Sequence, residues 1–334
     1  MSNRFKIIVQ YIFFLGLGLF FAWLSLKNLN EENLRQIKDS LAGARQWLII
    51  PVFLMLVLSH YLRALRWRLL MNPLGHRPSA INTFFAVLIG YLINLGVPRL
   101  GELAKCTLLA RYEKIPAEQL IGTIITERII DALSLLLVFA LTLGLQPGLY
   151  TQLIQTLFPA TNSTTASSPS LTTLLLLAGS LGLFLLYWLA IKKKTLGQLQ
   201  RQIGGLLRKV YAGVSSIVAL QQRALFIFLS FCIWALYLVA GYIGFFAFTE
   251  TSHYALKEAL TILSVGSIGM IASPGGIGAY AFLLEKSMQL YGLPYGIALA
   301  FGWLLWLAQT GVTVLTGFVS FLLLPWFNKK QQGR

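Results

Sequence analysis

The apolar stretch 80–112 is interrupted near its middle by Val97-Pro98-Arg99-Leu100-Gly101-Glu102, and the stretch 255–291 by Ser273-Pro274-Gly275-Gly276-Ile277-Gly278. Each half is too short to cross a hydrocarbon core of ~30 Å at ~1.5 Å per helical residue. We therefore expect two broken, re-entrant helical hairpins, each dipping into the membrane and returning. Eight full crossings are the alternative.

The rest of the chain is typical of a polytopic membrane protein. Hydrophobic residues make up 57% of the 334 positions and charged residues only 11%, whereas a soluble domain carries roughly 25% charged residues. We predict an all-α membrane protein forming a single integral domain, 1–334. Six full transmembrane helices are expected at about 7–27, 47–70, 117–145, 172–191, 224–248 and 294–324.

The two interrupted stretches occupy corresponding places in an internal repeat, 47–145 and 224–324. In each half a proline opens the break and a second proline opens the next long span: Pro98 and Pro116 in one, Pro274 and Pro294 in the other. Interrupted helices at matching positions indicate the binding site of a transporter.

The distribution of Lys and Arg predicts the topology, because basic residues favour the cytoplasmic side. It places both termini in the cytoplasm and the uncharged connection 146–171 outside, so the two hairpins enter from opposite faces and the repeat is inverted. The basic segment 192–222 is expected to lie on the cytoplasmic leaflet as an amphipathic helix. It is either a topology anchor or a recruiter of anionic lipid. The residues assigned to the cytoplasm include Arg63, Arg66, Arg68, Arg77, Lys192, Lys193, Lys194, Lys329, Lys330 and Arg334.

The first break contains charged groups at membrane depth, where an unpaired charge costs ~2.5–3.5 kcal/mol. Arg99 lies beside the helix that begins near Gly101, and the free N–H groups of that helix would favour an anion such as a phosphate. Glu102 follows within the same turn. The alternative is that Arg99 and Glu102 only pair with each other to close the hairpin.

The span after Pro116 carries a second charged motif. Glu127 and Asp131 are four residues apart and share a helix face, while Arg128 points about 100° away and can serve another neighbour. We expect a network between this span and the first hairpin. It is either part of a substrate site or a purely structural set of ion pairs.

The second break offers Pro274, Gly275, Gly276 and Gly278, whose flexible backbone opens another short helix. We include these four residues in the candidate substrate site, with Arg99, Gly101, Glu102, Glu127, Arg128 and Asp131.

No motif for catalysis, metal binding or ATP hydrolysis accompanies these residues. The chain lacks a GxxxxGK[ST] loop, its two cysteines form no metal pattern, and its three histidines are widely separated. We expect no cofactor, no metal and no catalytic residue. The net charge of +16 lies at span ends, which does not favour a nucleic-acid partner.

At these motifs the sequence resembles a known family. The PRLGE turn, Glu127-Arg128-x-x-Asp131 and the late PGGIG turn resemble the flippase-like membrane domain of lysylphosphatidylglycerol synthases over roughly 5–325. The chain is expected to be a member without the soluble aminoacyltransferase domain. The family commonly has Glu where this sequence has Ala281; Glu285, one turn later, could take the place of that carboxylate.

The resemblance implies a lipid translocase of the bacterial cytoplasmic (inner) membrane. Its substrate would be an anionic or aminoacylated phospholipid or a polyprenyl-phosphate-linked lipid. Two alternatives stay open: a membrane-embedded enzyme acting on a lipid phosphate, and a non-transporting partner of a lipid synthase or glycosyltransferase.

Overall fold

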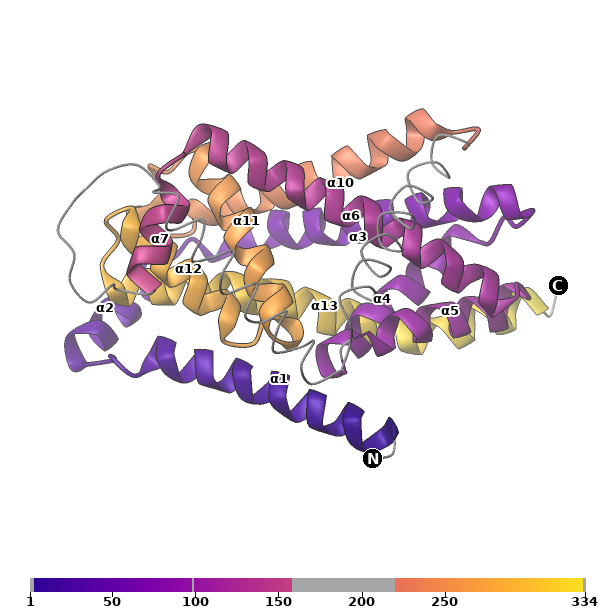
Figure 1. Ribbon diagram of the computed structural model, residues 1–334, viewed down its shortest axis with the longest axis horizontal. Helices are drawn as coiled ribbons and strands as arrows, with labels where there is room; N and C mark the ends of the chain where they lie inside the picture. Colours follow the sequence, from indigo (N-terminus) through magenta and orange to yellow (C-terminus); the bar gives the residue numbers. More distant parts are fainter. Residues whose placement is uncertain (1–2, 98, 158–219, 333–334) are drawn as a thin grey trace, which may run out of the picture.

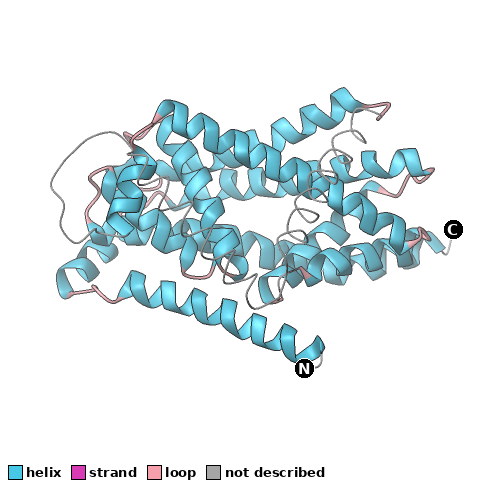
Figure 2. Cartoon of the chain, viewed as in Figure 1, coloured by secondary structure: helices cyan, strands magenta, loops and turns pink. Residues whose placement is uncertain are grey.

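A computed structural model describes residues 3–97, 99–157 and 220–332. Pro98, the predicted span 172–191 and nearly all of the basic segment 192–222 lie outside the described residues. Within the described ranges all regular structure is helical (Figure 2). The helices are α1 (Asn3–Leu26), α2 (Glu31–Ala42), η1 (Gln46–Leu48), α3 (Ile49–Met71), η2 (Asn72–Leu74), α4 (Ala80–Gly96), α5 (Leu100–Glu113), α6 (Ala117–Leu145), α7 (Leu149–Leu157), α10 (Arg223–Phe245), η3 (Thr249–Thr251), α11 (Leu256–Ala272), η4 (Pro274–Gly276), α12 (Ala279–Leu290) and α13 (Tyr295–Gln332).

Among the described residues, four helical regions are long and apolar enough to cross a bilayer, by length and composition. They are Gln46–Leu74, Ala117–Leu145, Arg223–Phe245 and Tyr295–Lys329, and they match four of the six predicted spans. The predicted span 7–27 corresponds to α1, a helix of 24 residues. The protein is therefore an all-helical, multi-pass membrane protein.

Both interrupted stretches form broken helical hairpins, as predicted. The first consists of α4 and α5, with 17 and 14 residues, and the second of α11 and α12, with 17 and 12 residues, joined by η4. Even the longest half, at about 26 Å, is shorter than the ~30 Å hydrocarbon core. The breaks coincide with left-handed backbone at Arg99, Gly275, Gly276 and Gly278.

The tips of the two hairpins touch each other near the middle of the molecule (Figure 1). A Cβ added at Gly275 would lie 2.8 Å from Leu95 Cδ2, so the η4 turn packs directly against the end of α4. Helix α1 covers the other side of the same turn, because a Cβ at Gly278 would lie 2.3 Å from the Gly18 carbonyl oxygen. Close backbone approach of this kind requires glycine.

Each half of the bundle has the same order of long helix, broken hairpin and long helix, and corresponding helices run in opposite directions. The antiparallel pairing of α3 with α10 is marked by Arg45 N–H donating to Ala247 O at one end (2.9 Å) and Arg66 Nη1 donating to Ser230 Oγ near the other (3.2 Å). This packing fits the predicted inverted repeat, whose boundaries stay a prediction.

Two short helices lie in segments that the sequence analysis expected to be only connections. Helix α2 begins after Asn30, whose side chain accepts a hydrogen bond from Asn33 N–H, a standard helix start. Helix α7 forms at the start of the uncharged connection 146–171 because Leu153 is buried against Phe282 and Leu283 of α12.

Candidate functional site: a buried ion cluster beside the first hairpin

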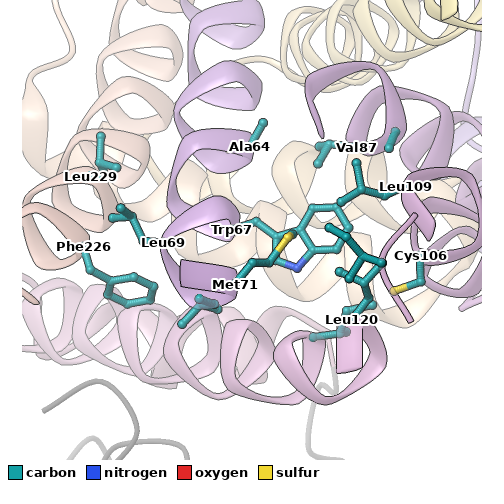
Figure 3. Close-up of a cluster of buried hydrophobic side chains, with 14 of the residues drawn as sticks. Ala64, Trp67, Leu69, Met71, Val87, Cys106, Leu109, Leu120, Phe226 and Leu229 are labelled. Carbon is teal, nitrogen blue, oxygen red and sulfur yellow. The ribbon is translucent and has the colours of Figure 1, made fainter. Parts of the chain in front are cut away.

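Trp67 of α3 forms the centre of a buried apolar core from which the charged groups extend. Its side chain is fully buried and lies among Met71, Val87, Leu109 and Leu120 (Figure 3). The indole N–H donates to Thr123 Oγ1 of α6 at 2.8 Å. Helices α3, α4, α5 and α6 are thereby fixed relative to one another, and so are the ionic side chains on their next turns.

Next to this core, three cations face two carboxylates. Lys105 Nζ of α5 lies 2.7 Å from Glu127 Oε2, and Arg66 Nη2 of α3 lies 2.6 Å from Asp131 Oδ1. Arg63, one turn earlier on α3, is paired with the other oxygen of Asp131. Glu127 Oε1 also lies 3.7 Å from Arg66 and 3.8 Å from Arg63. We call these five residues the ion cluster.

The ion cluster is buried and carries one excess positive charge. The side chain of Arg66 is 0% exposed and that of Glu127 only 4%. Arg66 also donates to Ser230 Oγ and Arg63 to the Tyr237 hydroxyl (3.5 Å), both on α10, so the cluster joins the two halves. Burying ions costs several kcal/mol each unless they are paired. Within the described part of the chain, the Nε atoms of both arginines have no hydrogen-bond partner.

The structure divides the predicted motif of α6 between two sets of partners. Glu127 and Asp131 enter the ion cluster, while Arg128 pairs with Glu102 of α5, on the more exposed side of the same interface. The 100° offset of Arg128 accounts for this separation. The pairing of Glu102 with Arg128 replaces the Arg99–Glu102 pair that the sequence left as an alternative.

Arg99 lies at the tip of the first hairpin and is exposed. Its side chain makes no hydrogen bond or ion pair with any residue of the described ranges. Its φ of 70° is left-handed, a conformation that costs a non-glycine residue roughly 1–2 kcal/mol. Strained residues of this kind are concentrated at functional sites.

Gly101 allows the two halves of the first hairpin to pack closely. A Cβ at this position would lie 1.9 Å from the Gly90 carbonyl oxygen of α4. The Gly101 N–H, expected to be free for an anion, instead donates to Asn94 Oδ1 at 2.8 Å. Asn94 therefore caps the start of α5.

The glycines of the second hairpin shape its tip. Gly275 O accepts a hydrogen bond from Trp306 Nε1 of α13 at 2.9 Å. Gly276 and Gly278, with φ of 72° and 70°, turn the chain into α12 after Pro274. These four residues contact α4, α1 and α13, whereas the ion cluster is built by α3, α5 and α6.

Glu285 of α12 is buried and lies away from the tip. Its Oε1 is 2.8 Å from Lys286 Nζ, and its Oε2 accepts a hydrogen bond from Ser25 Oγ of α1 at 3.3 Å. Ala281 packs instead against Gly302 of α13. The carboxylate thus fixes α12 to α1.

Sequence reasoning missed three members of the ion cluster. It assigned Arg63 and Arg66 to the cytoplasm by charge bias, which is wrong because the structure buries both inside the bundle. Their separation of three residues, which places them on one helix face, was the available signal. A second available signal was Lys105, a lone cation amid the apolar residues of the first hairpin.

Among the residues with described side chains, no group of three or more His, Cys, Asp or Glu lies close enough together to hold a metal ion.

The two broken helical hairpins and the ion cluster enclosed by α3, α5 and α6 define an all-helical, multi-pass membrane protein with buried charges. The chain belongs to the family of the lysylphosphatidylglycerol synthase transmembrane region, whose model matches residues 7–317. This match confirms the resemblance seen in the sequence and supports a membrane function related to lipids.

Comparison with curated proteins gives one weaker similarity. The UPF0104 membrane protein MJ1595 of Methanocaldococcus jannaschii is 29% identical over 86 residues, which are 25% of this chain. The chain thus spans about a quarter (26%) of that relative's length. No solved structure matches the chain.

Proposed function

We propose that this protein moves a charged phospholipid, or a polyprenyl-phosphate-linked lipid, between the two leaflets without hydrolysing ATP. The observation that carries the proposal is the contact between two broken hairpins at their tips, with Arg99 on the first tip and without a partner among the described residues. Transporters place their substrate site where such interrupted helices meet.

Arg99 supplies the first contact for the lipid phosphate. Its guanidinium is exposed and has no partner in the described structure, and its planar set of donors matches phosphate oxygens. The Arg128–Glu102 pair joins α6 to the first turn of α5, the helix that begins next to Arg99. It can exchange its internal ion pair for contacts with a charged head group.

The ion cluster sets the positive potential of this region. Three cations against two carboxylates leave a surplus that favours an anion, and at low dielectric this field is screened little. The acyl chains stay in the bilayer while the head group passes between the halves. Rocking of one half against the other then moves the lipid, driven by a gradient or by downhill flow. We place both termini in the cytoplasm of a bacterial cell.

The test is lipid translocation in proteoliposomes. Fluorescent phosphatidylglycerol is placed in both leaflets, and the fraction that an impermeant quencher reaches is followed over time. We compare the wild type with Arg99→Gln and Arg128→Gln, which alter exposed side chains, and with the control Glu118→Gln, an exposed carboxylate in the first turn of α6.

The proposal predicts that the wild type and the Glu118 variant accelerate exchange and that the two arginine variants are at least tenfold slower. Equal rates for all variants, or no acceleration by the folded wild type for any charged lipid, would contradict it.

A further inference from the structure

A second site lies between α13 and the arm formed by α1 and α2, apart from the ion cluster. It is a cavity of about 350 Å³, within the ~300–1,000 Å³ typical of small-molecule sites. Apart from the buried indole N–H of Trp303, the described lining side chains are apolar; they include Leu26 and Leu29 beside the end of α1, Ile37 and Leu41 of α2, and Trp303 and Leu307 of α13. We call it the α2–α13 groove.

The groove opens to the surface that faces lipid. Leu26, Leu41 and Leu307 are 46%, 41% and 56% exposed, and Leu307 belongs to the membrane-spanning part of α13. Water in the groove would find one side-chain hydrogen-bond partner at most, the Trp303 indole N–H, and a stable water needs at least two. Hydrocarbon from the surrounding bilayer is the matching occupant.

The sequence of helix α2 suits a position at the boundary between head groups and acyl chains, beside the mouth of the groove. It is amphipathic: Glu31, Glu32 and Lys38 are exposed, while Ile37 faces the groove. Helices of this kind lie in the interface with their apolar side ~5–10 Å deep. Because α2 carries charges of both signs, it selects no particular head group, and recognition falls to the acyl chain.

We propose that the α2–α13 groove binds one acyl chain of a membrane phospholipid, which stays with the protein and joins the α1–α2 arm to α13. The proposal does not rest on lipid translocation. Helices α2 and α13 touch each other but leave the apolar side chains of the groove uncovered beside their contact. A bound acyl chain covers these side chains, and each methylene that it buries adds to retention.

The first experiment uses a photoreactive side chain. Leu307 is replaced by benzoylphenylalanine, and Leu315, which is equally exposed on the same helix at 56% but does not line the groove, is replaced in the control protein. Each protein is extracted from its membrane, washed extensively in detergent, irradiated and weighed intact. We expect an adduct of one phospholipid mass at position 307 and none at position 315.

Three results would overturn the proposal: no lipid adduct at position 307, equal adducts at both positions, or an adduct of a second 37.2 kDa chain, which would assign the groove to another copy.

A second measurement uses native mass spectrometry of Leu307→Trp and Leu315→Trp. The indole at position 307 displaces roughly two methylenes of the chain and lowers lipid retention about tenfold. Unchanged retention by the folded Leu307 variant would also refute the proposal.

Discussion

Replacing Lys105 by Met removes the closest partner of Glu127 and leaves that carboxylate buried. The 2.7 Å contact from Lys105 Nζ is lost, and the remaining contacts, with Arg63 and Arg66, are 3.8 and 3.7 Å long. Removing one partner of a buried pair costs ~3–5 kcal/mol. Because the two arginines compensate in part, we expect Lys105→Met to lower the free energy of unfolding by about 3 kcal/mol.

Adding Glu127→Gln to Lys105→Met reverses most of this loss. The double variant has no unpaired carboxylate. Lys105 Nζ lies 4.4 Å from the centre of the Trp67 ring, and Met replaces this cation–π contact by a contact between its thioether and the ring. We therefore expect it to be within about 1 kcal/mol of the wild type, which corresponds to a coupling energy of ~2 kcal/mol or more between the two sites.

The assay is reversible unfolding in bicelles, with the free energy of unfolding measured for the wild type, the two single variants and the double variant. Arg111→Met on α5, an exposed cation near the end of that helix, is the control for loss of positive charge. Additive losses in the double variant would refute the reasoning, because they would show that Lys105 and Glu127 do not stabilise each other.

Three further predictions concern the hairpin tips. Gly278→Ala places a methyl group 2.3 Å from a backbone oxygen of α1, at a position with left-handed backbone. It should lower the free energy of unfolding by about 3 kcal/mol. The control Gly311→Ala, which has open space around it, should be neutral or stabilising, and thermal unfolding checks both variants. Trp306→Phe removes the hydrogen bond to Gly275 O and should cost ~1 kcal/mol in the same assay. Arg99→Gly relieves the left-handed strain at this position. The free energy of unfolding should equal that of the wild type or exceed it by up to ~1 kcal/mol, while translocation should become slower. A destabilised protein with full translocation activity would contradict both expectations.

The hairpins were predictable from sequence because their signal is local. Proline and glycine interrupt an apolar stretch whatever lies around it, and the observed breaks at Arg99 and Gly275 fall inside the predicted turns. The span ends follow from hydropathy in the same way. Helix α2 was missed because its start depends on the cap by Asn30 and its apolar side is narrow.

The ion cluster was only half predictable because it depends on packing across helices. The spacing of Glu127 and Asp131 indicates one face, but nothing local shows that Arg63 and Arg66, which precede Asp131 by 68 and 65 residues, lie opposite them. Charge bias treats every arginine near a span end as a topology signal. Burial beside α10 reverses that assignment for both residues.

The most direct test of translocation between the hairpins is a reversible lock at their tips. A Cβ at Gly275 would lie 3.9 Å from Leu95 Cβ, within the ~3.5–4.5 Å found in disulfides. The pair Leu95→Cys and Gly275→Cys is introduced in a chain with Cys106→Ser and Cys232→Ser, and each single cysteine variant serves as a control.

Translocation of fluorescent phosphatidylglycerol is then measured under oxidising conditions and again after adding a reductant. If the lipid passes where the two hairpins meet, oxidation of the double-cysteine protein stops exchange and reduction restores it, while the single-cysteine proteins respond to neither. Full translocation by a protein whose disulfide is shown to be complete would contradict the proposed route.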